Sequence, residues 1–271
     1  TMGTQVTVVE FMDKILPRED TDVSKEVEKI MKKKGLQIMT GAAVEKVEVV
    51  NGQSVVTVKT KTGTEKITCD VVLSAVGIAT NIEGIGLEEV GVKTDKGLVV
   101  VDDFYKTNIP GVYAIGDIVK GPALAHVASA EGITCVEKIA GKNPEPIDYG
   151  NIPSCTYCIP EVASVGLTEE EAKAKGYTLK VGKFPFSASG KASASGAKDG
   201  FVKVIYDAKY GEWLGAHLVG MNVTEMIAEV VVARKLETTG HEIIKAIHPH
   251  PTMSEAIMEA TAAAFGEVIH L

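Results

Sequence analysis

Residues 5–39 read QVTVVEFMDKILPREDTDVSKEVEKIMKKKGLQIM, and the order of their patterns sets the fold class. Residues 5–9 are typical of a buried strand, which ends in Glu10. Apolar residues then recur on one face of a helix predicted over 22–34, and a second strand is predicted at 36–39. A strand, a helix and a strand in this order predict a parallel crossover unit of an α/β domain.

A small β-meander is predicted next. Residues 47–59 should form a hairpin, because Asn51 and Gly52 lie between two β-rich segments and tolerate the positive φ angles of a tight turn. A third strand is expected near Lys66. Apolar or small-residue runs then predict strands at 71–76 and 112–115 and a helix at 122–140.

The pattern changes after residues 141–153, which are rich in Gly, Pro and Asn and are predicted to form a domain boundary. Beyond it, strands come first and helices follow, which is typical of an α+β domain. Thr168 opens a short helix there, with Glu171 in capping-box position. A stretch rich in Ser, Gly and Ala at 186–200 is predicted to be a mobile loop. The other predicted elements are strands at 201–206 and 213–219 and helices at 224–236 and 252–264.

Composition limits the classes of protein and partner. The chain has 271 residues, enough for about two domains, and a formal net charge of −8, which argues against a nucleic-acid partner. No apolar run approaches the roughly 20 residues that span a bilayer, so no membrane association is expected. Four cysteines without a secretory signal predict a reducing, cytoplasmic compartment and no disulfide framework.

Glu10 is a candidate for dinucleotide binding. An acidic residue after the second strand of a dinucleotide domain accepts hydrogen bonds from the adenosine ribose and repels the extra phosphate of NADP. A solvated glutamate at a strand end is the alternative, and it is favoured for this residue taken alone. The glycine-rich loop expected about 20 residues upstream cannot fit, because only nine residues precede Glu10. We therefore favour a chain that begins inside a dinucleotide site.

Gly116 and Asp117 follow a fully apolar predicted strand. Ligands of open α/β sheets bind beyond the carboxyl ends of strands, where a glycine lets the backbone approach the ligand and a carboxylate can hold hydroxyl groups. A turn that caps the following helix accounts for the same two residues equally well.

The segment HPHPTMSE at 248–255 holds the candidate acid–base residues. Thr252 and Glu255 have capping-box spacing after Pro251, so one interpretation is that the Glu255 side chain caps a helix. In the other, Glu255 fixes the tautomer of His250, and the free ring nitrogen acts as a base near neutral pH. These two interpretations rank equally, whereas a metal-binding turn lacks a third ligand.

Cys155 and Cys158 are separated by two residues, which suggests zinc or redox chemistry. Zinc needs two further ligands, and the chain has no second cysteine pair. A redox pair normally lies at a helix N-terminus, whereas the following residues, Ile159 and Pro160, indicate an extended segment. Semi-buried thiols without a chemical role are the favoured interpretation, and no metal site is expected.

Four motifs, taken in order, resemble one family. They are VTVVE at 6–10, AIGD at 114–117 with LAH at 124–126, PEVASVG at 160–166, and HPTMSE at 250–255. Over essentially the whole chain they resemble the pyridine nucleotide–disulfide oxidoreductases. The last motif, with His248 two residues upstream, is most similar to the dihydrolipoamide dehydrogenases within that family.

The resemblance implies a role for each candidate residue. Glu10 would bind the adenosine ribose of NAD, and Val44 and Gly77 would line that site through their backbones. His250 would be the catalytic acid–base residue, oriented by Glu255. The peptide bond that joins His250 to the next residue, a proline, is one that can be cis. FAD would be bound by Gly116, Asp117, Leu124, Ala125 and His126.

The implied fold is α/β with three parts. Residues 1–76 would be the C-terminal part of a Rossmann-like NAD-binding domain, and 77–150 the C-terminal segment of an FAD-binding domain. Residues 151–271 would be an α+β interface domain that forms a homodimer and delivers His250 to the active site of the partner subunit.

The implied activity is oxidation of dihydrolipoamide on a lipoyl-bearing acyltransferase, with reduction of NAD+ through FAD and a redox disulfide. The family's redox cysteine pair, separated by four residues, is absent, as are both glycine phosphate loops. The isolated chain is therefore expected to be inactive and to bind FAD weakly or not at all. Alternatives are a glutathione reductase, mercuric reductase or transhydrogenase type, disfavoured by Glu10 or by the lack of terminal cysteines, and a non-catalytic dimerisation module.

Overall fold

The computed structural model describes residues 2–270, which fall into two compact units. One unit joins the chain up to Val72 with the chain from Pro153 onward, and the other comprises Leu73–Ile152. Compactness does not assign a segment to a cofactor-binding domain, so the three-part division at residues 76 and 150 stays a prediction. Within the described range, no helix is both long enough and apolar enough to cross a bilayer.

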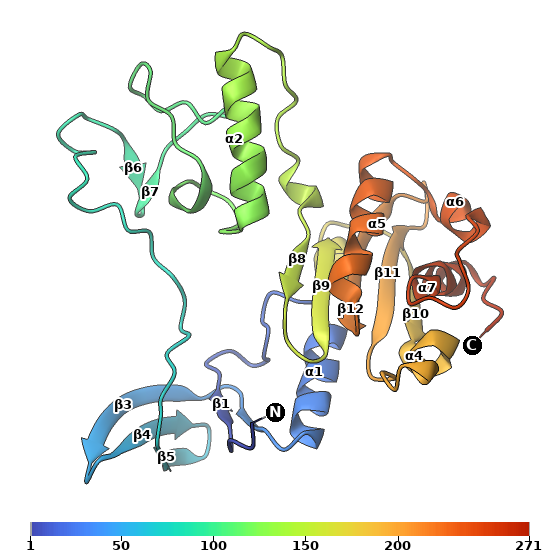
Figure 1. The fold of residues 1–271 in the computed structure, drawn as a ribbon, viewed down its shortest axis with the longest axis horizontal. Coiled ribbons are helices and arrows are strands. Elements are labelled where there is room, and N and C mark those ends of the chain that lie inside the picture. The colour runs from blue at the N-terminus through green and yellow to red at the C-terminus, as the bar shows by residue number, and fades with distance from the viewer. Residues whose placement is uncertain (1, 271) are drawn as a thin grey trace. The chain divides into compact units, whose positions relative to one another are not determined.

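The first unit opens with the predicted crossover. Strand β1 (Thr7–Val9) pairs in parallel with β2 (Gln37–Met39), and α1 (Thr21–Lys33) connects them (Figure 1). Asp20 caps α1, because its side chain accepts a hydrogen bond from the backbone nitrogen of Asp22 at 2.9 Å. The predicted strand–helix–strand unit is confirmed.

The predicted meander is also confirmed. It consists of β3 (Ala43–Val50), β4 (Gln53–Thr60) and β5 (Gly63–Cys69), paired antiparallel in that order. Asn51 and Gly52 have φ angles of 52° and 83°, so both central residues of the first turn lie in the left-handed region that a two-residue hairpin requires.

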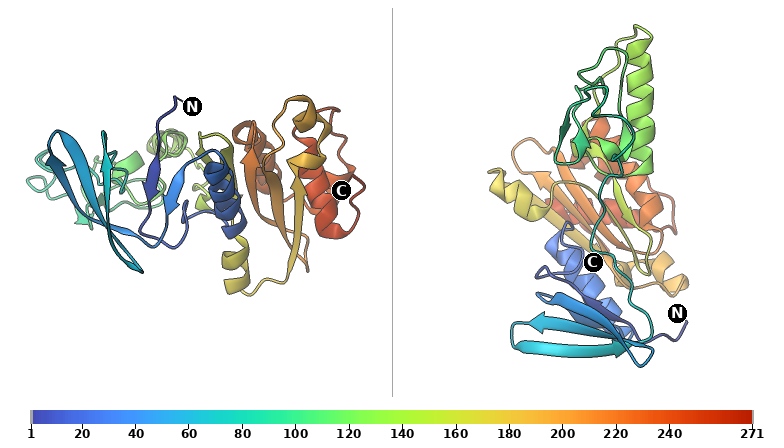
Figure 2. Two further views of the ribbon diagram at one scale, coloured as in Figure 1. Left: turned by 90° about the horizontal axis from the view of Figure 1, so that it is seen from below. Right: turned by 90° about the vertical axis from the view of Figure 1, so that its left-hand side faces the viewer.

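A five-stranded antiparallel sheet forms the rest of this unit. Its order is β10 (Leu179–Pro185), β11 (Phe201–Asp207), β12 (Trp213–Gly220), β9 (Glu161–Gly166) and β8 (Ser154–Thr156). Every residue of β11 and β12 is buried, because both faces of the sheet are covered. Figure 2 shows α1 in blue on one side of these strands and the C-terminal helix in red on the other.

Most helices of this part follow the strands, in the expected α+β order. They are α5 (Val223–Lys235), α6 (Gly240–Lys245) and α7 (Glu255–Phe265), whereas α3 (Glu169–Ala174) lies between β9 and β10. Helices α5 and α7 pack on the face of β11 that presents Val202 and Val204, whereas α1 packs on the face that presents Phe201. The capping box between Thr168 and Glu171 at the start of α3 is present as predicted. The mixed α/β fold class is confirmed.

The second unit contains less regular structure. Its elements are β6 (Thr94–Asp95), β7 (Leu98–Val99), the 3-10 turns η1 (Gly116–Ile118) and η2 (Tyr149–Asn151), and α2 (Ala125–Ile139). Helix α2 confirms the helix predicted over 122–140, but it begins three residues later, after Leu124. Its side chains Val127 and Cys135 are buried within this unit.

Three predicted elements are wrong. Residues 71–76 and 112–115 are not ladder strands: the first has no strand partner among the described residues, and the second makes one bridge, between Tyr113 and Lys106. An apolar run shows that a strand is possible, but it does not show that a neighbour exists to hydrogen-bond it. The loop predicted at 186–200 holds two short helices, η3 (Phe186–Ala188) and α4 (Gly190–Ala194), because Phe186 and Ala192 insert into the core.

Candidate functional site

The turn between α6 and α7 carries the candidate acid–base pair. The peptide bond between His250 and Pro251 is cis, and α7 begins at Glu255 rather than at Thr252 as predicted. His250 lies on the outside of the unit, where its side chain is 76% exposed. The Glu255 side chain, in the first turn of α7, is 26% exposed.

Glu255 makes both of the contacts that its sequence context suggested. Its Oε1 lies 2.9 Å from Nδ1 of His250, and its Oε2 accepts a hydrogen bond from the Thr252 backbone nitrogen at 2.8 Å. Burial opposes ionisation of this carboxyl, but the Thr252 N–H and the His250 imidazole outweigh it and hold the pKa of Glu255 below its usual value. The two interpretations that sequence ranked as alternatives are therefore compatible.

The capping box itself is only half formed. Oγ1 of Thr252 donates to the carbonyl oxygen of Pro249 at 2.8 Å and lies 3.0 Å from Oγ of Ser254. The other bond of a capping box, from the Glu255 backbone nitrogen to the Thr252 side chain, does not form in this turn. The Thr252 side chain thus bonds within the turn, and the Glu255 side chain accepts the hydrogen bond from the Thr252 N–H.

The hydrogen bond to Glu255 sets the tautomer of His250. An ionised carboxylate can only accept, so Nδ1 of His250 carries the proton. In the neutral ring, Nε2 then has a free lone pair on a side chain that faces solvent. The pair is therefore arranged to take a proton at Nε2 and to stabilise the resulting imidazolium through Glu255.

His248, two residues upstream, has a different environment. Its side chain is 8% exposed, and Nε2 lies 2.9 Å from Oε1 of Glu229 on α5, while Nδ1 lies 3.1 Å from the Ala246 carbonyl oxygen. The hydrogen bond to Glu229 raises the pKa of His248, and burial opposes this only in part. The sequence offered no signal for Glu229, which lies 19 residues away on another helix.

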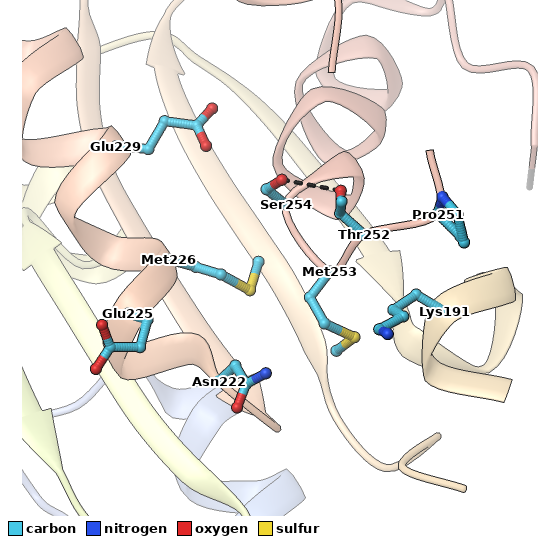
Figure 3. A pocket seen from close by; sticks show the side chains of 9 residues that line it. All are labelled: Lys191, Asn222, Glu225, Met226, Glu229, Pro251, Thr252, Met253 and Ser254. Carbon is cyan, nitrogen blue, oxygen red and sulfur yellow. Dashed lines mark hydrogen bonds between the residues drawn. The ribbon is translucent and has the colours of Figure 1, made fainter. Parts of the chain in front are cut away.

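A cavity of about 450 Å³ lies between α5 and the turn that follows His250. Figure 3 shows the side chains of Met226 and Met253 directed into it from opposite walls, and the bond between Thr252 and Ser254 at one side. The cavity is lined by Lys191, Asn222, Glu225, Met226, Glu229, Pro251, Thr252, Met253 and Ser254. His250 does not line it, so the reactive nitrogen and this cavity are separate features of the turn.

The residues predicted to bind FAD gather at one end of α2. Gly116 and Asp117 form η1, Leu124 is the N-cap of α2, and Ala125 and His126 are its first residues. Gly116 has a φ of 73°, and a Cβ there would lie 3.2 Å from the Cβ of Ala128, so the turn needs glycine. The Asp117 side chain is exposed.

A buried carboxylate that sequence reasoning missed holds this turn. Glu131 on α2 is 1% exposed; its Oε2 accepts from the Gly116 backbone nitrogen and its Oε1 from the Tyr149 hydroxyl, both at 2.6 Å. The hydroxyl of Tyr105 lies 3.2 Å from that of Tyr149. Burial and the neighbouring Glu131 carboxylate raise the pKa of Tyr149. A single acidic residue inside a run of small residues was the available signal.

The residues predicted to bind NAD do not all lie in one unit. Glu10 follows β1, and its Oε1 accepts a hydrogen bond from the Met12 backbone nitrogen at 2.8 Å. Val44 is half exposed on β3, in the same unit. Gly77 belongs to the other unit and has a φ of 128°, with open space where a side chain would be. Glu10 and Val44 therefore belong to one unit and Gly77 to the other.

Cys155 and Cys158 are both free thiols of intermediate burial. Burial raises the pKa of each, which disfavours the reactive thiolate. Sγ of Cys158 donates to the Pro160 carbonyl oxygen at 2.9 Å. Across residues 2–270, no group of three or more His, Cys, Asp or Glu side chains is arranged to hold a metal ion. The raised pKa values agree with the interpretation of these cysteines as unreactive thiols.

Comparisons with known proteins match both parts of the chain. Residues 1–132 match the pyridine nucleotide-disulphide oxidoreductase model, and residues 152–261 match the dimerisation domain of the same family. The dihydrolipoyl dehydrogenase of Rhizobium etli is 52% identical over 271 residues, which cover 99% of this chain and 56% of that protein. The dihydrolipoyl dehydrogenase of Bacillus subtilis is 47% identical over 270 residues, which cover 99% of this chain and 57% of that protein.

Solved structures give the same result. LpdA from Mycobacterium tuberculosis superposes with a TM-score of 0.87 at 27% identity, covering 96% of this chain and 56% of that chain. The HOCl-induced flavoprotein disulfide reductase RclA from Escherichia coli superposes with a TM-score of 0.88 at 25% identity, covering 96% and 59%. The chain thus spans little more than half the length of these relatives.

Proposed function

Because the chain belongs to the pyridine nucleotide-disulphide oxidoreductase family, we propose that it forms part of a dihydrolipoyl dehydrogenase. The reaction is oxidation of dihydrolipoamide to lipoamide with reduction of NAD+. The observation that carries the proposal is the hydrogen bond between Nδ1 of His250 and Glu255, which leaves Nε2 of an exposed imidazole free to move a proton.

His250 and Glu255 supply the proton chemistry of this reaction. A dithiol loses two electrons and two protons when it becomes a disulfide, and the thiolate is the reacting species. In the proposed mechanism Nε2 of His250 takes the thiol proton, and Glu255 stabilises the imidazolium through Nδ1. FAD, when bound, supplies the route by which the electron pair passes from a redox disulfide to the pyridine nucleotide.

The cofactor residues are proposed on the same basis. FAD would be held by Gly116, Asp117, Leu124, Ala125 and His126, since a glycine turn fixed by Glu131 places the exposed Asp117 carboxylate where it can accept bonds from hydroxyl groups. NAD would be held by Glu10, Val44 and Gly77. The carboxylate of Glu10, at the carboxyl end of β1, is suited to ribose hydroxyls.

The proposed partners follow from the third part of the chain. Residues 151–271 would form the homodimer, which the match of 152–261 to a dimerisation domain supports. The substrate would arrive on a lipoyl-bearing acyltransferase. We place the protein in the cytoplasm, a reducing compartment that suits its four free thiols.

The chain alone should be inactive, because the redox cysteine pair and both glycine phosphate loops are absent from its sequence. The test is an assay of NAD-linked dihydrolipoamide oxidation with the chain alone, and with the N-terminal part of the Bacillus subtilis relative supplied in trans. We expect activity in the second case only, and its loss by 100-fold or more with His250→Gln, the order of magnitude of general acid–base catalysis. Turnover by the chain alone, or full activity of His250→Gln, would refute the proposal.

A further inference from the structure

The imidazole of His248 lies between two acceptors. Nδ1 faces the Ala246 carbonyl oxygen at 3.1 Å, and Nε2 faces Oε1 of Glu229 at 2.9 Å. A carbonyl oxygen and a carboxylate oxygen both accept and cannot donate, so each ring nitrogen must carry a proton to satisfy this geometry. The arrangement therefore selects the imidazolium form of His248.

His250 is held in the opposite manner. Its Nδ1 meets one acceptor, Oε1 of Glu255, and the rest of its ring is exposed. The geometry suits a neutral ring with Nε2 free. Two histidines separated by one proline are thus held differently: His248 faces an acceptor at both ring nitrogens, and His250 faces one at Nδ1.

The bond between His248 and Glu229 joins the turn to α5. The other polar bonds of the turn are local: Thr252 reaches Pro249, and Glu255 reaches Thr252 and His250. These local bonds shape the turn but do not attach it to α5. The ion pair does so, with a histidine side chain that is 8% exposed.

Resting on the proposed function, we propose that His248 is a positioning residue for the dihydrolipoamide reaction: as an imidazolium bound to Glu229 it fixes the turn that sets His250 against Glu255. When His248 loses one proton, the Glu229 carboxylate keeps the remaining proton on Nε2, so the bond to the Ala246 carbonyl is lost and the ion pair becomes a weaker hydrogen bond from a neutral ring. The weaker attachment then holds His250 less firmly in the orientation that Glu255 requires.

The charges around His248 give the pH dependence. The charged groups that act on it are Glu229 on α5, which has the largest effect, and Glu255 on α7; together with the Ala246 carbonyl they raise the pKa of His248 against the effect of burial. A raised pKa means that the attachment is strongest at low pH and weakens as the pH rises through that value. His248 thus predicts an alkaline limb of activity.

The test measures His248 in this chain by NMR, following its imidazole through a pH titration and assigning it by its absence in His248→Gln. Glu229→Gln keeps an oxygen that can accept from Nε2 but removes the charge. We expect the pKa of His248 to fall in Glu229→Gln and the Nδ1–H tautomer of His250 to become less populated once His248 has lost its proton. The matched control is Glu225→Gln, an exposed glutamate one turn earlier on α5, which should change neither readout.

A second arm uses the assembled holoenzyme. There Glu229→Gln should move the alkaline limb of kcat to lower pH, whereas a purely structural defect would lower kcat at every pH. The inference would be overturned if the pKa of His248 were unchanged in Glu229→Gln. It would also be overturned if the His250 tautomer and the alkaline limb did not depend on the protonation of His248. If the holoenzyme does not oxidise dihydrolipoamide, the proposed function fails, and the NMR arm still decides the attachment.

Discussion

The turn that carries His250 and the turn that carries Gly116 are both held by glutamates, but the structure that supports each turn differs. The first is built on a sheet covered by helices on both faces, with Phe186 and Leu218 fully buried. The second is held by the Glu131 network on a helix that leaves Ile133 64% exposed. In one unit a large apolar core supports the polar contacts of the turn, and in the other a buried polar network holds the turn. Substitutions should therefore act on different quantities in the two units.

The largest effect is expected from the core of the first unit. Phe186→Ala removes a fully buried ring and should lower the free energy of unfolding by about 3–5 kcal/mol. Ile133→Ala, on the exposed face of α2, should change it by less than about 0.5 kcal/mol. Urea denaturation of both variants measures the difference. If the two variants lowered the free energy of unfolding equally, the proposed difference in how the two units are stabilised would be wrong.

Phe186 also shows what the sequence could and could not reveal. The crossover around α1, the hairpin at Asn51 and Gly52, and the order of strands and helices after residue 153 were predictable from period and turn chemistry. Phe186 lies in a run of Ser, Gly and Ala that has no periodicity, so its burial was not. Burial there depends on the tertiary packing of Phe186 and Ala192 into the sheet core, which short-range pattern does not encode.

The candidate site, like the fold, was predictable from the sequence only in part. His250 and Glu255 are five residues apart, and their pairing was one of two interpretations that the local spacing allowed. The partners Glu229 and Glu131 lie 19 and 15 residues from the groups they hold, on other elements, and no local motif links them to those groups. Local motifs identify the reactive groups, whereas the groups that position them follow from tertiary structure.

The second-largest effect on stability is expected at Lys203, whose side chain is 4% exposed. Its Nζ lies 2.9 Å from Oδ1 of Asp20, 3.1 Å from Oδ2 of Asp22 and 2.7 Å from Oε2 of Glu169. Lys203→Met leaves the fully buried Asp20 without a counter-charge and should cost about 3 kcal/mol at neutral pH. Lys173→Met is the control, since Lys173 pairs with the same Glu169 at the surface and should cost less than about 0.5 kcal/mol.

The pH dependence sharpens this prediction. Burial alone would raise the pKa of Asp20, but Lys203 and backbone N–H groups outweigh it and lower that pKa. A lowered pKa means that the stabilisation is complete above the ordinary carboxyl range and is lost as the pH falls through the lowered value. The gap between wild type and Lys203→Met, measured by urea denaturation at several pH values, should therefore narrow in acid. A gap that widens in acid would contradict the ion-pair explanation.

A smaller effect is expected at Glu131, confined to the second unit. Glu131→Ala leaves the Gly116 N–H and the Tyr149 hydroxyl without their acceptor, at a cost of about 1–3 kcal/mol. Glu131→Gln is the matched control, because its oxygen can accept from Gly116 and its amide can donate to Tyr149. Hydrogen exchange of the Gly116 amide should speed up in the first variant and change little in the second. Unchanged exchange in Glu131→Ala would mean that packing, and not this carboxylate, holds the turn.

The smallest effect on stability is expected at Glu255. Its two oxygens accept from Nδ1 of His250 and from the Thr252 nitrogen, and a glutamine has only one oxygen with which to accept. Glu255→Gln should therefore lose one of these bonds and cost about 1 kcal/mol, the usual value of a helix cap, measured as a lower midpoint in thermal unfolding. Glu267→Gln, an exposed glutamate 3.9 Å from Lys245, is the control and should leave the midpoint in place. If Glu255→Gln costs no more than the control, the sheet core alone fixes the turn, and Glu255 serves only to orient the imidazole.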